Sequence, residues 1–256
     1  MRRLLERLLM IGLLMSTIIL VVSGAPVTMS SNSSGPEVIK INSHPYFGRC
    51  KYGQVTVYLG IFKVANDGDN MWNYYVIRIV VQAVPFGRIA HIRVVAFPDV
   101  ACPRRRVPYF YWRLIGYAPH ATPGSSKISK SHTSALSASV SFVVFPDPRI
   151  CAAIKHSQVD TVSFSYAIPD MIIEDFSDFR FQLACWEVDI NEGAELSDNY
   201  IHYCLGENTF YGEFVVIVRV EEGCYNHIIW SVKVLFSNSV CTRWDEVLLE
   251  HVNELR

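Results

Sequence analysis

The sequence predicts an all-β protein: a large antiparallel β-sandwich stapled by disulfides, with few short helices. Two patterns favour this fold class. Short runs rich in β-branched and aromatic residues are separated by Gly, Pro, Asn and Asp. Several runs alternate polar with apolar residues, as Val-Ser-Phe-Ser-Tyr does at 162–166. The chain has 256 residues, is 50% hydrophobic and only 18% charged, so it can bury a substantial core.

Candidate strands follow one another from residue 54 onward. Turn residues separate them: Asn66-Asp67-Gly68-Asp69 lies between the first two, and Pro146-Asp147-Pro148 ends the fifth. Nine strands match the size of a large sandwich. The predicted strands span residues 54–64, 73–84, 89–97, 109–117, 138–145, 161–168, 180–190, 212–220 and 228–236.

Helix is expected in only two places. Residues 243–255 carry Trp244, Val247, Leu248 and Val252 at helical spacing, which predicts a C-terminal helix. Residues 150–155 favour a short helical turn. The stretch 119–137, rich in Ser, Thr, Lys and Gly, predicts a long exposed loop.

The N-terminus has the features of a secretory signal peptide. Basic residues precede an apolar stretch at 8–22, and small residues follow it, so we expect cleavage after Gly24. Residues 1–24 are the predicted signal peptide, 25–43 a flexible segment with a glycosylation sequon at Asn32, and 44–256 a single β-sandwich domain. The mature protein is therefore expected to be secreted and not membrane-bound.

Seven cysteines are expected to form disulfides, because thiols in an oxidising compartment usually pair. Their spacing contains no C-x-x-C motif typical of zinc sites. The number is odd, so one must be free, buried or paired between chains. The candidates are Cys50, Cys102, Cys151, Cys185, Cys204, Cys224 and Cys241.

Charge is distributed unevenly along the chain. Residues 78–155 contain eleven basic and two acidic residues, whereas residues 170–222 contain thirteen acidic and two basic ones. Two interpretations follow. Strands from the two segments interleave, so that their charges complement each other, or one face presents the acids to a basic partner, which would speed association.

Motifs for catalysis are absent. The eight histidines form no H-E-x-x-H or H-x-H pair, and no G-x-S-x-G or glycine-rich phosphate loop occurs. We therefore expect no enzyme, no catalytic residues, no cofactor and no metal. The basic loop Arg104, Arg105 and Arg106 could contact a sulfated glycosaminoglycan, whereas nucleic acid is not expected for a secreted chain of near-neutral charge.

One segment carries a family resemblance. Cys204 is followed by Asn208, a valine-rich strand from Phe214, an acidic turn at 221–223, and then Cys224 and another alternating strand. This order resembles the C-terminal region of the poxvirus immune-evasion β-sandwich family. The resemblance implies a secreted decoy that sequesters a host cytokine of the GM-CSF or interleukin-2 class. The alternatives are a chemokine-binding decoy, an MHC class I-binding protein, and an adhesion or structural glycoprotein that forms a homodimer through its charged halves.

A binding protein of this kind needs anchoring and steering residues. Tyrosine and tryptophan bury large rigid surfaces at low entropic cost, and acids speed encounter with a basic partner. The candidates are Trp72, Tyr74 and Tyr111 for anchoring, with Asp175, Asp178 and Glu195 for steering.

Overall fold

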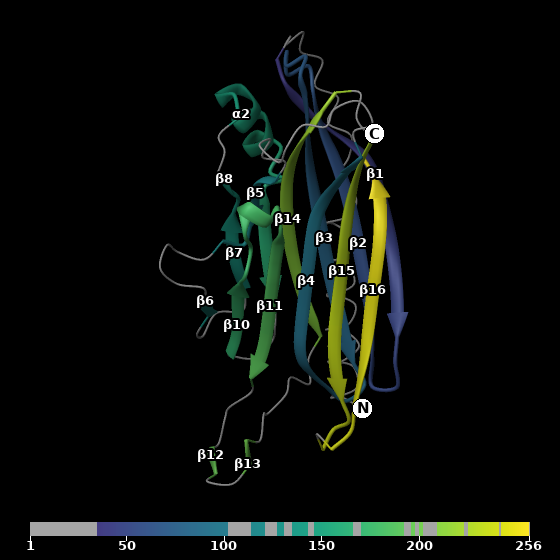
Figure 1. The fold of residues 1–256 in the computed structure, drawn as a ribbon. Coiled ribbons are helices and arrows are strands. Elements are labelled where there is room, and N and C mark those ends of the chain that lie inside the picture. Colours follow the sequence, from purple (N-terminus) through teal and green to yellow (C-terminus); the bar gives the residue numbers. More distant parts are fainter. Residues whose placement is uncertain are drawn as a thin grey trace, which may run out of the picture. The chain divides into compact units, whose positions relative to one another are not determined.

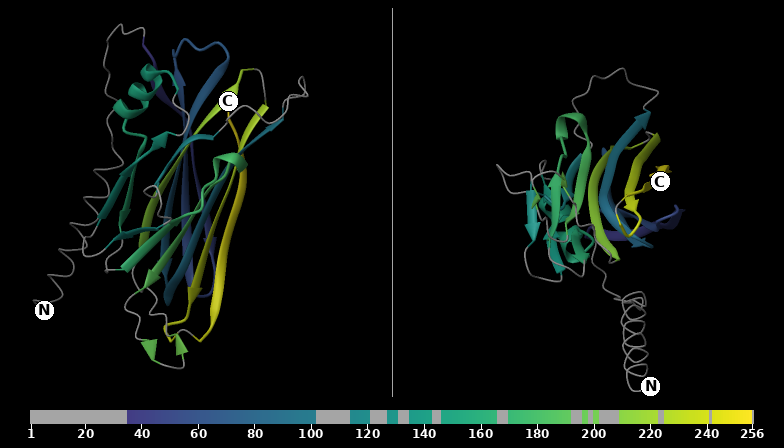
Figure 2. Two further views of the ribbon diagram at one scale, coloured as in Figure 1. Left: turned by 60° about the vertical axis from the view of Figure 1, so that its left-hand side comes forward. Right: turned by 90° about the horizontal axis from the view of Figure 1, so that it is seen from below.

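Two antiparallel sheets packed face to face form the protein (Figures 1 and 2). The computed structural model describes residues 35–101, 114–120, 127–130, 135–142, 146–165, 170–191, 196–197, 200–201, 209–222, 225–240 and 242–255. These residues belong to a compact unit that begins at Gly35. The predicted all-β class is confirmed.

The first sheet contains both N-terminal hairpins. Within the described residues its order is β1-β2-β3-β14-β5-β8. Strand β9 also pairs with β14, and β7 pairs with β9. The strands are β1 (Glu37–Arg49), β2 (Gly53–Ala65), β3 (Trp72–Pro85), β5 (Leu114–Ala118), β7 (Ala135–Ser139), β8 (Ser141–Phe142), β9 (Thr161–Ser165) and β14 (Phe210–Glu221).

The second sheet contains the C-terminal hairpin. Its order in the described chain is β16-β15-β4-β11-β10-β6, and β12 with β13 form a separate pair. The strands are β4 (Arg88–Ala101), β6 (Lys127–Lys130), β10 (Asp170–Asp175), β11 (Ala184–Asn191), β12 (Leu196–Ser197), β13 (Tyr200–Ile201), β15 (Tyr225–Ser237) and β16 (Trp244–Glu254).

The core lies between the two sheets. Alternate residues of β2, β3 and β14 point inward from the first sheet, and alternate residues of β4, β11 and β15 point inward from the second. Trp186 on β11 meets Phe214 on β14, with ring centroids 5.0 Å apart. Each large apolar side chain buried in this way contributes about 1.5–3 kcal/mol.

The short helix α2 (Pro148–His156) confirms the helical turn expected at 150–155. Asp147 caps its N-terminus by accepting from the Arg149 N–H at 2.8 Å, and proline occupies the first turn, where its missing N–H costs nothing. Ile150 and Ile154 are buried, which fixes the helix to the sandwich. A 3₁₀ turn, η1 (Phe179–Phe181), precedes β11.

Both edges of the fold differ from the prediction. The C-terminal helix expected at 243–255 is wrong: the segment is β16, which pairs with β15 from Trp244 to Glu254. Strand β1 begins at Glu37, inside the segment 25–43 that was expected to be flexible, and pairs with β2 along its length.

The predicted disulfide staples find no support in the structure. Cys50, Cys151 and Cys185 are free thiols, and the other four cysteines lie outside the described residues. Burial raises the pKa of the Cys185 thiol above its usual value, and burial also raises that of Cys151. The two sheets bury a large apolar core between them, which stabilises the described sandwich.

Candidate functional site

Three hairpin turns converge at one end of the sandwich, the lower end in Figure 1. They connect β1 with β2, β3 with β4, and β15 with β16. We call residues 49–53, 85–88, 238–240 and 242–244 the hairpin tip. The β1–β2 hairpin belongs to the first sheet, and the β15–β16 hairpin belongs to the second. The β3–β4 turn crosses between the sheets, so the tip joins both layers.

Hydrogen bonds tie the three turns together. The Phe86 N–H donates to the Tyr52 carbonyl at 2.8 Å, which joins the first turn to the second. The Lys51 N–H donates to Asp245 Oδ2 at 3.0 Å, which joins the first turn to the third. A Cβ on Gly87 would lie 2.1 Å from the Ser237 carbonyl oxygen, so only glycine allows the second and third turns to approach this closely. The backbone of the tip is therefore fixed.

Asn238 shapes the turn between β15 and β16. Its side-chain Oδ1 accepts from the N–H of Thr242 at 2.8 Å and of Arg243 at 3.1 Å. Its own N–H donates to the Arg243 carbonyl at 3.0 Å. An asparagine that satisfies the turn in this way leaves the neighbouring side chains free to point outward.

Large apolar side chains stand exposed on the tip. Phe86 is 52% exposed, Val240 68% and Trp244 47%. Turns normally carry small or polar residues at such positions. Exposed apolar groups gathered on a fixed surface mark an interaction site.

Basic residues surround these apolar groups. Arg49, Lys51, Arg88 and Arg243 lie in the tip, and the adjoining acid is Asp245, whose carboxylate accepts two backbone N–H groups. The Arg49 guanidinium lies 5.2 Å from the centre of the Phe86 ring. This cation–π contact holds a charge beside an exposed ring.

The opposite end of the sandwich carries four acids. Its β2–β3 turn has Asp67 and Asp69, Glu221 ends β14, and Glu222 follows it. The Glu222 N–H donates to the Met71 carbonyl at 3.0 Å, which joins the two turns. The same end also carries the basic residues Lys63 and Arg219, so both signs of charge are present there.

A shallow depression of about 420 Å³ adjoins the tip on the outer face of β1 and β2. Phe47 and Arg49 line it from β1, and Gln54 and Thr56 line it from β2. The depression thus combines an apolar ring, a cation and hydrogen-bonding side chains. In the described part of the chain, no cluster of His, Cys, Asp and Glu could hold a metal ion.

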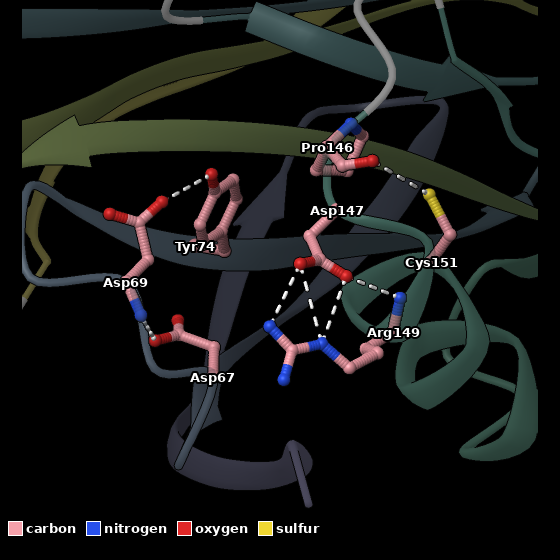
Figure 3. A network of polar contacts seen from close by, with 7 residues as sticks. All are labelled: Asp67, Asp69, Tyr74, Pro146, Asp147, Arg149 and Cys151. Atoms are coloured by element: carbon pink, nitrogen blue, oxygen red, sulfur yellow. Dashed lines mark hydrogen bonds and ion pairs between the residues drawn. The ribbon is translucent and has the colours of Figure 1, made fainter.

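The residues predicted for anchoring do not form a surface. Tyr74 is buried, and its hydroxyl donates to Asp69 Oδ2 at 2.9 Å (Figure 3). Burial, chiefly, raises the pKa of Tyr74 far above the ordinary value. The half-buried Trp72 lies under the Arg219 guanidinium at 4.6 Å. Tyr111 lies outside the described residues.

The residues predicted for steering have local partners. Asp175 is 5% exposed, and its Oδ2 lies 3.1 Å from His120 Nδ1. Asp178 caps η1 and pairs with Arg180 at 2.7 Å, and this hydrogen-bonded guanidinium lowers the pKa of Asp178. The remaining predicted sites, Glu195, Asn32 and the loop Arg104, Arg105 and Arg106, lie outside the described residues.

The uneven charges of the sequence meet across neighbouring strands. On β4 and β11, His91 Nδ1 lies 2.8 Å from Asp189 Oδ1, and Arg93 Nε lies 3.4 Å from Glu187 Oε1. On β3 and β14, Arg78 pairs with the buried Glu213 at 2.6 Å. The structure therefore supports the interpretation that the two segments interleave and complement each other.

Comparison with known proteins assigns no family to the chain. No family model matches the chain, and no curated protein matches it. Among solved structures, one described as "Pore forming protein" aligns with a TM-score of 0.39 and 12% identity, covering 86% of this chain and 94% of that chain. The Clostridium perfringens NetB toxin in its membrane-inserted form aligns with a TM-score of 0.36 and 10% identity, covering 85% and 94%.

These comparisons correct the expected function. The predicted cytokine-binding decoy, with a host cytokine or chemokine as partner, is wrong, because the similar solved structures are described as pore-forming proteins. The same finding overturns the expected alternatives, an MHC class I-binding protein and an adhesion or structural glycoprotein. A glycosaminoglycan was also expected as a partner, and a membrane was not. The same finding overturns both expectations. The poxvirus resemblance itself stays a prediction.

The hairpin tip was missed from the sequence. Its three turns lie far apart along the chain, and only the strand register brings them together. One local signal was available: Pro85-Phe86-Gly87-Arg88 places an aromatic residue beside a cation inside a turn. An aromatic residue at a turn has little to pack against and indicates contact with a partner.

Proposed function

We propose that this chain is a secreted, non-enzymatic protein that binds anionic membrane surfaces with its hairpin tip. The observation that carries the proposal is the gathering of exposed apolar and basic side chains on one hydrogen-bonded tip. Among the described residues, no helix is both long and apolar enough to cross a membrane. The contact that we propose is peripheral, made by the loops and side chains of the tip.

The chemistry of the tip fits a lipid headgroup layer. Each lysine or arginine near an anionic membrane contributes about 1 kcal/mol, so the three exposed basic residues of the tip, Arg49, Lys51 and Arg243, together contribute about 3 kcal/mol. Trp244 suits the boundary between headgroups and acyl chains, where its ring lies in apolar surroundings and its N–H in polar ones. Phe86 and Val240 would add apolar burial at the same depth.

The position of the tip favours a single orientation. Its exposed apolar and basic side chains lie at one end of the strands, and an anionic surface attracts the basic ones. The molecule would thus approach with its strands pointing toward the membrane.

Flotation with lipid vesicles tests the proposal. The purified chain is mixed with phosphatidylcholine vesicles, either pure or containing phosphatidylserine, at low and high salt. We expect it to float with the phosphatidylserine vesicles at low salt and to be released as salt rises, because salt screens charge. Binding should also shift the emission of Trp244 to shorter wavelength, and Trp244→Phe should abolish that shift.

Matched variants assign the contact to the tip. Lys51→Glu should weaken binding by more than tenfold, since reversing a charge removes one attraction of about 1 kcal/mol and adds a repulsion. Lys155→Glu, on exposed α2 surface, is the control for charge. Val240→Ser should weaken binding, whereas Met71→Ser, 63% exposed at the opposite end, should not. Equal losses in the tip and control variants, or no flotation at all, would refute the proposal.

A further inference from the structure

The outermost strands of the two sheets lie on the same side of the sandwich. Strand β1 ends the order of the first sheet and β16 ends that of the second, and no further strand pairs with either in the described part of the chain. Figure 2 shows β1 in purple and β16 in yellow next to each other in the view from below. A seam of contacts joins them: the rings of Tyr46 and His251 lie 4.1 Å apart.

Both edge strands are long and exposed. Strand β1 has 13 residues and β16 has 11, and most of their side chains face solvent. An exposed edge strand offers a row of unpaired N–H and C=O groups, which natural proteins usually shorten, cover or charge. Strand β16 carries acids, and β1 contains Pro45 and an irregularity between Lys40 and Asn42. Apolar side chains nevertheless remain on the outer faces: Ile39, Ile41 and Phe47 on β1, and Leu248 and Val252 on β16, between 40% and 69% exposed.

The two edges also differ in charge. Strand β1 carries Lys40 and Arg49 with the single acid Glu37. Strand β16 carries Asp245, Glu246, Glu250 and Glu254 and no lysine or arginine. An edge that is mildly basic and an edge that is acidic attract each other between two molecules.

From these features we infer that two copies of this chain pair edge to edge about a two-fold axis parallel to the strands. The rotation places β1 of one copy beside β16 of the other, twice, because both edges lie on one side of the sandwich. Such a contact is self-complementary and closes as a dimer. The first sheet of each copy then continues into the second sheet of its neighbour.

The seam within one copy sets the alignment between copies. A Cβ on Gly48 would lie 2.3 Å from Val247 Cγ1 and 3.2 Å from Leu249 Cδ2, so Gly48 stands level with residues 247–249 of β16. Rotation about an axis parallel to the strands does not shift residues along the strand direction. Gly48 of one copy is therefore at the same height as residues 247–249 of the other, and β1 and β16 stay antiparallel. Phe47 of one copy then lies beside Leu248 of the other on a common face, and Arg49 lies beside Glu246.

The dimer has a consequence for the hairpin tip. The same rotation leaves both tips at the same end, so a flat surface meets two tips at once. Linking two binding sites in this way raises their combined affinity above that of one. The inference itself concerns the edges and does not depend on membrane binding.

Engineered cysteines test the pairing without lipid. The chain with Phe47→Cys and Leu248→Cys carries two new thiols that point from opposite outer faces of one copy, so no disulfide can close within it. In the dimer they are cross-strand neighbours, at a Cα separation of about 4.5–5.5 Å that suits a disulfide. We expect a covalent dimer on a non-reducing gel after mild oxidation.

Control variants make the outcome decisive. The parent chain reports any linkage through the native thiols Cys50, Cys151 and Cys185, and each single variant should stay monomeric on the gel. Pairing Leu248→Cys with Phe181→Cys, 75% exposed on η1, should give no dimer. A ladder of higher species would refute the closed two-fold contact, and a monomer at high concentration would refute edge pairing altogether.

A solution measurement gives the second readout. By sedimentation equilibrium, Leu248→Lys should raise the dimer dissociation constant by about tenfold or more, because a charge replaces an apolar contact at the edge. Phe181→Lys should leave the constant unchanged. Equal weakening by both, or no dimer in the parent chain, would overturn the inference. Flotation of a monomeric variant with vesicles would still support the membrane proposal, so the two can fail separately.

Discussion

The seam between β1 and β16 depends on one asparagine, and its removal gives a sharp test of the fold. Asn253 Oδ1 accepts from the Trp230 indole Nε1 at 2.8 Å, and Asn253 Nδ2 donates to the Tyr46 hydroxyl at 2.7 Å. Trp230 is fully buried. Asn253 thus links the core of the second sheet to the outermost strand of the first. Asn253→Ala breaks both bonds at once.

The expected loss of stability depends on which group each broken hydrogen bond leaves without a partner. A buried indole N–H without an acceptor costs about 1–3 kcal/mol, whereas the Tyr46 hydroxyl, being only partly buried, can turn to water and loses less. We therefore expect Asn253→Ala to lower the free energy of unfolding by about 2 kcal/mol. For a domain of this size that corresponds to a Tm lower by about 4–8 °C.

Urea and thermal unfolding followed by circular dichroism measure the loss. Asn70→Ala, on the exposed β2–β3 turn, is the matched control and should stay within about 0.5 kcal/mol of the parent. Combining Asn253→Ala with Tyr46→Phe should cost less than the sum of the two, because they share a bond. A loss for Asn253→Ala no greater than that of the control would show that the seam does not hold the edge strands.

Three further predictions concern stability. Gly87→Ala should lower the Tm markedly, because its Cβ would strike a backbone oxygen, while Gly35→Ala, with open space around it, should not; thermal unfolding compares them. Glu213→Ala should cost about 3 kcal/mol in urea unfolding, since it leaves the Arg78 guanidinium partly buried without its carboxylate. Burial raises the pKa of Asp160 above its unfolded value, so ionisation opposes folding at neutral pH. Asp160→Asn should therefore stabilise the protein at pH 7, and the gain should vanish below about pH 4, where both states hold the proton.

Strands that bury one face were predictable from the sequence. The expected strand 54–64 is observed as Gly53–Ala65, and 73–84 as Trp72–Pro85. Buried apolar residues alternate with more exposed residues there, because only the inner face packs against the opposite sheet. Residues 212–220 were also found, as Phe210–Glu221, although burial on both faces removes the alternation, because a valine-rich run favours strand on its own.

The edge strands β1 and β16 were misjudged for a physical reason, while the short strands β6, β7 and β10 were also not predicted. An edge strand exposes both faces, so its apolar residues need not alternate. In β16 only Val247 is buried, while Leu248 and Val252 are 49% and 60% exposed, and their spacing matched a helix by coincidence. Strand β1 was missed because polar residues interrupt its apolar ones. Pairing with the neighbouring strand, which the local sequence does not encode, decides both.

Burial accounts for the fate of the predicted binding residues. Tyr74 was chosen because aromatic residues anchor interfaces, yet its hydroxyl has a partner, Asp69, five residues before it, so the ring can be buried. Asp175 was chosen for its charge and proved to lie against His120. Composition identifies which residue types can bind, but only the register shows which of them have already found partners within the chain.

Charge counted along the sequence and charge placed in space lead to different conclusions here. The basic segment 78–155 and the acidic segment 170–222 meet across β4 and β11, where pairs such as Arg93 with Glu187 cancel each other, so neither segment presents a uniform face. The exposed cations Arg49, Lys51 and Arg243 lie at the hairpin tip, away from this pairing between β4 and β11. In the proposed membrane contact the tip therefore sets how the molecule approaches an anionic surface. A dimer with both tips at one end doubles the number of these cations that meet one surface.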